Sequence, residues 1–204
     1  MEKIFIYLHN DMTDLSLIER YMGFYHRFFA SSLDPSYSYV LDLYIDNFLA
    51  GQAIIYYIRG GLRGVGVVYY VVVDERFRRR GLGKILVSSA EQIFEDLNLD
   101  FSIATASIDN VVSHRMFKSL SYDEEDLERI SRICSHQIQE MILKLSCGYE
   151  DDLLFYKDLR RPAYENNIKS LCETINQLDK DVVERHWLRS CYRPWRSYRS
   201  LIRL

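Results

Sequence analysis

Residues Phe77 to Leu86, FRRRGLGKIL, join a run of arginines to two glycines and then begin an apolar helical pattern. A strand that turns at glycine into a helix leaves the first helical amides without acceptors, at the positive end of the helix dipole. Such a helix start binds phosphate groups. Gly81 and Gly83 have no Cβ, so the backbone could lie directly against a pyrophosphate. The neighbouring cations that suit a polyphosphate ligand are Arg76, Arg78, Arg79, Arg80 and Lys84.

Two familiar phosphate loops do not match this segment. A P-loop requires G-x-x-x-x-G-K-[ST], but Lys84 is followed by isoleucine and no glycine lies five residues before Gly83. A dinucleotide-binding fold requires G-x-G-x-x-G, and Leu86 stands where the third glycine belongs. The pattern that remains is R-x-x-G-x-G, formed by Arg78, Gly81 and Gly83.

The segments before and after this junction predict a sheet with helices. β-rich runs predict strands over residues 3–9, 39–44, 50–58 and 66–73. Asp46-Asn47 and Gly60-Gly61 provide turn chemistry, so antiparallel pairing of the last three strands is expected, with the last one buried and central. Asp11 to Asp14 offer N-cap chemistry for a helix over residues 15–29, and a second helical stripe begins at Leu82.

The second half of the chain continues this alternation. The pattern predicts a strand over 101–108, a helix over Asn110 to Leu120, one longer helix over 123–149 that stops at Gly148, and a strand over 151–159. Pro162 then begins a helical extension that reaches roughly Tyr192, and Pro194 interrupts its arginine-rich end. We therefore expect one domain over residues 1–160 and a helical, arginine- and aromatic-rich extension over residues 161–204.

Composition excludes several classes of protein. The 204 residues are 48% hydrophobic and include 16 tyrosines, which suffices for one substantial core without metal or disulfides. The four cysteines form no C-x-x-C pair and have no histidine at zinc spacing, so buried free thiols and no metal site are expected. The apolar runs are too short for a membrane span. We expect a soluble, cytoplasmic protein with no membrane contact.

Charge is divided unevenly along the chain. No acidic residue follows Glu184, whereas six arginines do: Arg185, Arg189, Arg193, Arg196, Arg199 and Arg203. Residues 1–184 then hold 20 basic and 29 acidic side chains, a formal net charge of −9. An acidic body favours a cationic or amine-bearing acceptor. Aromatic residues interleave with the terminal arginines, a pattern that allows nucleic-acid binding but fits better an intramolecular strap or a dimer contact.

Residues 71–86, VVVDERFRRRGLGKIL, resemble the central strand, the R/Q-x-x-G-x-G/A pyrophosphate loop and the following helix of the GNAT superfamily of acyl-CoA-dependent N-acyltransferases. The resemblance covers roughly residues 1–160, because the expected order of elements is also the family's. It implies an α+β (α/β layered) fold, with a mixed, mostly antiparallel central sheet flanked by helices and here a C-terminal helical extension. It also implies acetyl-CoA as the cofactor.

The resemblance assigns cofactor contacts residue by residue. The amides of Arg79, Arg80, Gly81, Leu82, Gly83 and Lys84, next to Arg78, would hold the pyrophosphate of coenzyme A. The strand edge at Val71, Val72 and Val73 would pair with the pantetheine arm, as an extended peptide adds to a sheet edge. Asn110 stands in the family's asparagine position and Met116-Phe117 in its L/F-Y position, so Asn110 and Phe117 are expected at the cofactor. Ser121 replaces the usual glycine.

The expected catalytic positions depart from the family. Its members often carry a tyrosine at the position of Phe117, which has no proton to give, and a glutamate or tyrosine at the position of Val67, which cannot accept one. Strand alternation places Tyr69 on the same face as Val67, so Tyr69 is the candidate that relays a proton through water, and a packed aromatic is the other interpretation. His114, just after the expected helix start, is expected as a surface or capping-region histidine rather than as a base. Holding the amine and the thioester in line can itself supply much of the acceleration.

We therefore expect an N-acetyltransferase that moves an acetyl group from acetyl-CoA to a primary amine. The acceptor would be a protein N-terminus, a lysine or a small amine. The alternative is a catalytically weak, acyl-CoA-binding regulatory module that associates with nucleic acid through its basic tail. A homodimer through the C-terminal extension is compatible with both.

Overall fold

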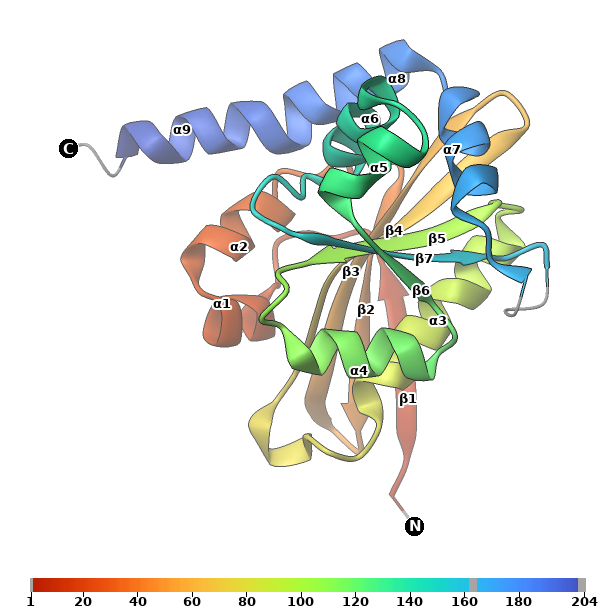
Figure 1. Ribbon diagram of the computed structural model, residues 1–204. Coiled ribbons are helices and arrows are strands. Elements are labelled where there is room, and N and C mark those ends of the chain that lie inside the picture. Colours follow the sequence, from red (N-terminus) through yellow and green to blue (C-terminus); the bar gives the residue numbers. More distant parts are fainter. Residues whose placement is uncertain (1, 162–164, 202–204) are drawn as a thin grey trace. The chain divides into compact units, whose positions relative to one another are not determined.

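The computed structural model describes residues 2–161 and 165–201 (Figure 1). The strands are β1 (Ile4–His9), β2 (Ser38–Ile45), β3 (Phe48–Gly60), β4 (Arg63–Val73), β5 (Phe101–Ala106), β6 (Asp123–Asp126) and β7 (Leu153–Asp158). The helices are α1 (Ser16–Met22), α2 (Phe24–Ala30), α3 (Leu82–Asp96), α4 (Val111–Ser119), α5 (Leu127–Ile133), α6 (His136–Ser146), α7 (Ile168–Asn176), α8 (Lys180–His186) and α9 (Arg193–Leu201), with a 3₁₀ turn η1 (Glu75–Phe77) and a π-helical segment η3 (Trp187–Tyr192). Among these residues, none of the helices combines the length and the apolar character that crossing a membrane requires.

The strands form one seven-stranded sheet in the order β1-β2-β3-β4-β5-β7-β6. Antiparallel ladders join β1 to β2, β2 to β3, β5 to β7 and β6 to β7. A parallel ladder joins β4 to β5 and comprises only Val65–Val67 paired with Phe101–Ile103. The mixed, mostly antiparallel sheet flanked by helices is therefore confirmed.

The described chain divides by compactness into two units. The first unit comprises residues 2–56, 68–90 and 186–201, and the second comprises residues 57–67 and those of 91–185 that the structure describes. β3, β4 and α3 each contribute residues to both units. A boundary between a domain over residues 1–160 and an extension over residues 161–204 stays a prediction.

In the first unit, the β2–β3 hairpin turns at Asp46, whose φ of +53° lies in the left-handed region that Asp and Asn tolerate. α3 packs on this hairpin through Leu86, which is fully buried. A Cβ at Gly51 on β3 would lie only 3.0 Å from Leu86 Cδ1. The expectation of one helix over residues 15–29 is wrong, because Gly23, with φ +94° and ψ 170°, separates α1 from α2.

In the second unit, the expectation of one helix over residues 123–149 is wrong. Residues 123–126 pair with β7 as strand β6, and Asp126 then caps α5 by accepting a hydrogen bond from the Glu128 amide at 2.7 Å. Ser135 caps α6 by accepting from the Ile138 amide at 3.2 Å. Both residue types favour helix starts, so the apolar periodicity is divided by two N-caps.

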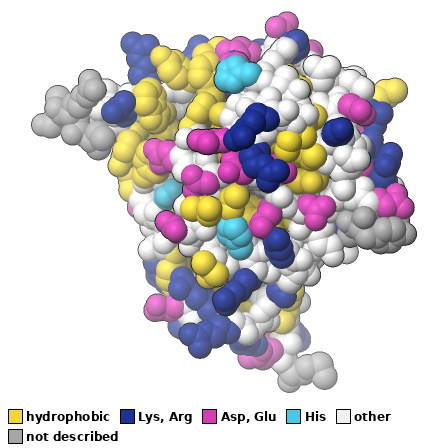
Figure 2. Space-filling view, in the orientation of Figure 1, with side chains coloured by type: hydrophobic (Ala, Val, Ile, Leu, Met, Phe, Trp, Pro, Cys, Tyr) yellow, Lys and Arg dark blue, Asp and Glu magenta, His cyan; other side chains and the backbone are white. Residues whose placement is uncertain are grey.

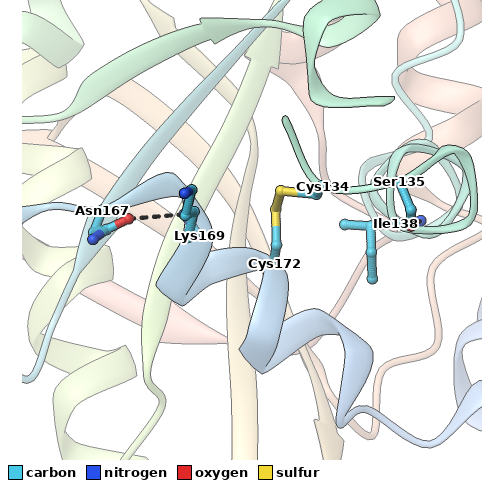
Figure 3. Close-up of a disulfide and its surroundings, with 6 residues drawn as sticks. All are labelled: Cys134, Ser135, Ile138, Asn167, Lys169 and Cys172. Atoms are coloured by element: carbon cyan, nitrogen blue, oxygen red, sulfur yellow. Dashed lines mark hydrogen bonds between the residues drawn. A yellow bond between two sulfur atoms is a disulfide. The ribbon is translucent and has the colours of Figure 1, made fainter. Parts of the chain in front are cut away.

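A disulfide joins Cys134, at the end of α5, to Cys172 on α7 (Figure 3). The same view shows the neighbouring N-caps, Ser135 of α6 and Asn167 of α7, which accepts from the Lys169 amide at 2.9 Å. The expectation of free thiols is therefore wrong for this pair, and it is also wrong for Cys147 and Cys191, because none of the four cysteines is free. The two cysteines are 38 residues apart, and no local spacing rule indicates that they pair.

The helical extension is confirmed over its described part, where α7 is followed by α8, η3 and α9. Its expected start at Pro162 lies outside the described residues. The expectation that Pro194 interrupts the arginine-rich end is wrong, because helical structure continues through α9 to Leu201. Pro194 is the second residue of α9, which continues without a break from the π-helical segment η3, and the Arg193 amide just before it donates to the Leu188 carbonyl.

Candidate cofactor and active site

The segment between β4 and α3 is organised by Asp74, which is fully buried. Its carboxylate accepts hydrogen bonds from the Arg76 amide at 3.0 Å and from Nε and Nη2 of the same arginine at 2.8 and 3.0 Å. Arg20 lies 3.6 Å away. The hydrogen bonds from Arg76 lower the pKa of Asp74 to about 2. Arg76 therefore compensates a buried carboxylate, and its contribution to a bound ligand stays a prediction.

Six consecutive backbone amides at the start of α3, those of residues 79–84, have no acceptor among the described residues. The Ile85 amide is the first to bond within the turn, to the Gly81 carbonyl at 3.1 Å. Arg79 has φ +64° and Gly81 has φ +80°. For Arg79 this is a strained conformation of the kind that gathers at ligand clamps.

The space beside Gly81 is open, because a Cβ built there would meet nothing within 4 Å. Leu82 is 3% exposed and anchors the helix start in the core, so only its backbone amide is available to a ligand. A positive helix end, a row of amides without acceptors and open space at a glycine together fit a pyrophosphate. The G-x-G segment thus presents amides without acceptors beside open space, and its role in binding a cofactor stays a prediction.

The basic side chains of this segment differ in their availability. Arg78 donates from Nε to the Val73 carbonyl at 3.0 Å, and its guanidinium lies 5.0 Å from the Tyr21 ring centroid. Arg80 pairs with Glu2. Arg79 and Lys84 are exposed and have no acidic partner within the described part of the chain. Figure 2 shows basic side chains gathered at the lower end of the view, where Figure 1 draws η1.

The last residues of β4 lead directly into this loop. Val71, Val72 and Val73 belong to the strand, and the Asp74 amide that follows them donates to the Ala50 carbonyl of β3 at 2.9 Å. Val72 is 7% exposed, whereas its two neighbours are half-buried. The parallel ladder of β4 is already complete at Val67.

Tyr69 and Tyr70 stack on each other near the end of β4, with ring centroids 4.1 Å apart and ring planes 25° apart. Successive side chains of a regular strand point to opposite faces, so simple alternation is broken here. Burial raises the pKa of Tyr70 well above its ordinary value, and the adjacent Tyr69 hydroxyl raises it further. Tyr70 therefore keeps its proton at neutral pH and can donate a hydrogen bond but not act as a base.

Aromatic side chains from two other elements of the first unit surround this pair. The Tyr56 ring of β3 lies edge-on to Tyr69 at 5.6 Å, and the His26 ring of α2 lies edge-on to Tyr70 at 5.2 Å. Sequence reasoning overlooked Tyr70 and His26, because strand alternation placed Tyr70 on the other face and α2 carried no recognisable motif. The signal that could have found them is the pair of consecutive tyrosines on a central strand.

The arginine-rich tail lies on α2 within the first unit. Tyr198 of α9 packs edge-on against Tyr25 at 4.7 Å and lies 6.2 Å from the Phe28 ring. Arg189 pairs with Asp34 at 3.2 Å. The tail is thus a strap on its own chain, and Arg193, Arg196 and Arg199 remain exposed.

The two remaining cofactor predictions, Asn110 and Phe117, belong to the second unit. The Asn110 side chain caps α4 by accepting from the Ser113 amide at 3.1 Å. Phe117 is 4% exposed and stacks on Phe155 at 4.9 Å. His114 lies in the first turn of α4, and its Nδ1 lies 3.1 Å from a carboxylate oxygen of Glu124.

Comparisons with known proteins agree with this architecture. The model of the acetyltransferase (GNAT) family matches residues 5–122. A proposed acyl-CoA N-acyltransferase from Klebsiella pneumoniae is 15% identical, with a TM-score of 0.56, and the match covers 78% of this chain and 98% of that one. The ribosomal-protein-S18-alanine N-acetyltransferase from Escherichia coli is 14% identical, with a TM-score of 0.53 and coverage of 82% and 99%.

An aminoglycoside N-acetyltransferase in complex with CoA is also 14% identical, with a TM-score of 0.50 and coverage of 59% of this chain and 88% of that one. At these identities the likeness to solved structures concerns the fold. The sequence matches none of the curated proteins with which it was compared.

Proposed function

Because the chain belongs to the acetyltransferase (GNAT) family, we propose that it is an N-acetyltransferase that uses acetyl-CoA and acetylates a primary amine. The observation that carries this proposal is the row of six amides without acceptors at residues 79–84, beside the open space at Gly81. These amides, with the exposed cations Arg79 and Lys84, would bind the pyrophosphate through charge-assisted hydrogen bonds. Arg78 would act mainly by fixing the loop, because it already bonds to Val73.

The end of β4 would then place the reactive part of the cofactor. The backbone of Val71, Val72 and Val73 would pair with the pantetheine arm, and the amide near Val71 would stabilise the negative charge that develops on the acyl oxygen. Bound acetyl-CoA supplies a thioester whose acyl carbon an amine nitrogen attacks, so that a C–N bond forms, the C–S bond breaks and thiol is released. Asn110 and Phe117 stay proposed cofactor contacts; Asn110 would act through its free amide group, since its oxygen caps α4.

One proton must pass from the attacking amine to the departing thiolate. Tyr69 is proposed to relay it: its hydroxyl would receive the amine proton through water while its own proton passes on toward the thiolate, which leaves as thiol. Tyr70 would hold its own proton and orient the Tyr69 hydroxyl against which it stacks. Phe117 and Val67 carry no ionisable group, so neither substitutes for Tyr69. If Tyr69 serves only as packing, positioning of the amine would have to carry the acceleration.

The proposed acceptor is a primary amine on a protein N-terminus, a lysine or a small molecule. Residues 1–184 carry a formal net charge of −9, which favours a cationic acceptor over an anionic one. The E. coli neighbour is named for an alanine of a ribosomal protein and another neighbour for aminoglycosides, so fold likeness does not choose between peptide and small molecule. Nucleic-acid binding by the exposed arginines of the tail, and a homodimer through the tail, stay predictions.

Calorimetry with coenzyme A and with pantetheine tests the binding step, because pantetheine lacks the pyrophosphate. Coenzyme A should bind the chain and pantetheine should bind far more weakly; equal affinities would remove the proposed role of residues 79–84. Turnover of acetyl-CoA is then measured with a panel of peptides, lysine, polyamines and aminoglycosides. Binding without turnover on any amine would support the regulatory module instead.

The role of Tyr69 is tested with a matched pair of variants. Tyr69→Phe and Tyr70→Phe each remove one hydroxyl from adjacent stacked rings, so they perturb packing to a similar degree. If Tyr69 takes the amine proton, Tyr69→Phe should lower kcat by about 10²-fold, the lower end for general base catalysis. A larger loss in Tyr70→Phe than in Tyr69→Phe would reverse the two roles.

A further inference from the structure

β1 forms one edge of the seven-stranded sheet, and within the described residues no strand pairs with its outer side. Natural proteins protect such edges with charges, prolines or bulges, because an open edge pairs with other strands. Residues Ile4 to Leu8 contain no charged residue and no proline. Their register with β2 runs without a shift from Ile4 opposite Ile45 to His9 opposite Val40. None of these protections is therefore present over Ile4 to Leu8 of β1.

The register shows which backbone groups of β1 remain open. The Asp46 amide donates to the Lys3 carbonyl at 2.7 Å, so this pair is a hydrogen-bonded one. In an antiparallel ladder, hydrogen-bonded pairs alternate with pairs that are not hydrogen-bonded. Phe5 and Tyr7 therefore bond to β2, whereas the amides and carbonyls of Ile4, Ile6 and Leu8 face outward.

The side chains of β1 are exposed on both faces of the strand. Ile4 is 48% and Leu8 42% exposed on one face, and Phe5 is 49% and Tyr7 60% exposed on the other. The Phe5 ring already stacks on Tyr44 of β2 at 5.0 Å, with ring planes 8° apart. An edge strand that faced only solvent would carry polar side chains on at least one face. Apolar exposure on both faces indicates a partner with side chains on both faces of the sheet, as a strand added beside β1 has.

We propose that β1 pairs antiparallel with β1 of a second copy of this chain, about a twofold axis at Ile6. The outward-facing residues must lie opposite one another, which places Ile6 opposite Ile6 and Ile4 opposite Leu8. Phe5 then lies opposite Tyr7, so the aromatic residues meet on one face and the aliphatic residues on the other. The contact uses the same patch on both copies and therefore closes as a dimer.

The ends of the strand agree with this occupant. Antiparallel pairing in this register brings Lys3 of one copy diagonally next to Asp11 of the other, at both ends of the contact. The two alternative twofold registers, centred on Phe5 or on Tyr7, leave Leu8 or Ile4 outside the apolar pairing. The register centred on Ile6 alone uses all five residues from Ile4 to Leu8.

The dimer is tested by sedimentation of a matched pair of variants. Leu8→Lys places a charge at the edge of β1, and Leu62→Lys makes the same change at a residue that is 99% exposed in the β3–β4 turn. The parent chain and Leu62→Lys should sediment with twice the mass of one chain, and Leu8→Lys should sediment as a folded monomer with an unchanged far-UV circular dichroism spectrum. A monomeric parent chain, or a Leu8→Lys variant that still dimerises, would overturn the proposal.

Cysteine cross-linking tests the register independently. In a hydrogen-bonded antiparallel pair the Cα atoms are about 5.5 Å apart, which lies within the roughly 4.4–6.8 Å that a disulfide spans. Ile6→Cys should therefore form a covalent dimer on mild oxidation. Phe5→Cys should not, because its copies lie diagonally at about 7–8 Å. Cross-linking of Phe5→Cys but not of Ile6→Cys would exclude this register. A dimer that is lost only when residues 187–204 are removed would place the contact in the tail instead of β1.

Discussion

Replacing Gly81 by alanine separates the conformational role of this glycine from its role in ligand binding. Gly81 has φ +80°, and an alanine Cβ would meet nothing within 4 Å. The change therefore introduces backbone strain of about 1–2 kcal/mol but no clash within the protein. Loss of unfolded-state freedom offsets about 0.4–1 kcal/mol of this. The free energy of unfolding should fall by about 1 kcal/mol, which lowers the melting temperature by about 2–4 °C for a chain of this length.

The effect on ligand binding should be larger. The new methyl group occupies the open space beside the amides of residues 79–84, where a pyrophosphate oxygen would approach. Loss of one hydrogen bond to a charged group costs about 1.5–3 kcal/mol, which weakens coenzyme A binding about 10–150-fold. Gly61→Ala is the matched control, because Gly61 also has positive φ, +61°, and open space within 4 Å but lies in the β3–β4 turn.

The assay is calorimetric titration with coenzyme A, combined with thermal unfolding of both variants. Both should lose similar stability, and only Gly81→Ala should lose affinity. If both variants lose stability equally and bind coenzyme A as the parent chain does, the helix start at α3 does not hold the pyrophosphate, and the reasoning fails. If the free energy of unfolding falls by several kcal/mol in Gly81→Ala alone, then the space beside Gly81 is not open to an alanine Cβ.

Three further predictions follow from the structure. The pKa of Asp74 is lowered to about 2, so the stability that its carboxylate contributes is complete above the ordinary pKa of 3.8 and is lost as the pH falls toward about 2. Urea unfolding of Asp74→Asn at several pH values should lack this acid-dependent loss of stability. The same loss in Asp74→Asn as in the parent chain would contradict the prediction. Replacing Cys134 and Cys172 by alanine opens a loop with a sequence separation of 38 and should lower the unfolding free energy, measured by urea unfolding, by up to about 4 kcal/mol; an unchanged free energy would contradict the contribution of this bond. Tyr198→Ala removes aromatic contacts to α2 worth about 0.5–1.5 kcal/mol each, so α9 should exchange amide hydrogens faster than in Trp195→Ala, and equal exchange would argue against the strap.

Local sequence was sufficient wherever a structure depends on a few consecutive residues. Gly81 takes positive φ because it lacks a Cβ, and Asn110 caps α4 because its side chain reaches the Ser113 amide. The hairpin turn at Asp46 follows from the same kind of local preference. These features made the strands, the helices after Gly81 and Asn110, and the glycine-containing start of α3 predictable.

Sequence reasoning failed where two local signals competed. The apolar periodicity of residues 123–149 fits a helix, yet residues 123–126 gain more by pairing with β7, and Asp126 and Ser135 start new helices. Gly23 similarly ended a helix that the periodicity continued. Pattern alone does not weigh a long-range ladder against a local turn.

The sequence by itself determined that a basic, glycine-containing helix start follows a buried strand, because turn conformation and helix ends depend on neighbouring residues. Only the tertiary structure decided that Arg76 pairs with the buried Asp74, that Tyr69 and Tyr70 stack, that Cys134 meets Cys172 and that β1 is left at an edge. The disulfide and the edge position of β1 depend on segments that lie far apart in the chain. Their partners are chosen by the packing of the whole sheet and its helices, which no short stretch of residues specifies.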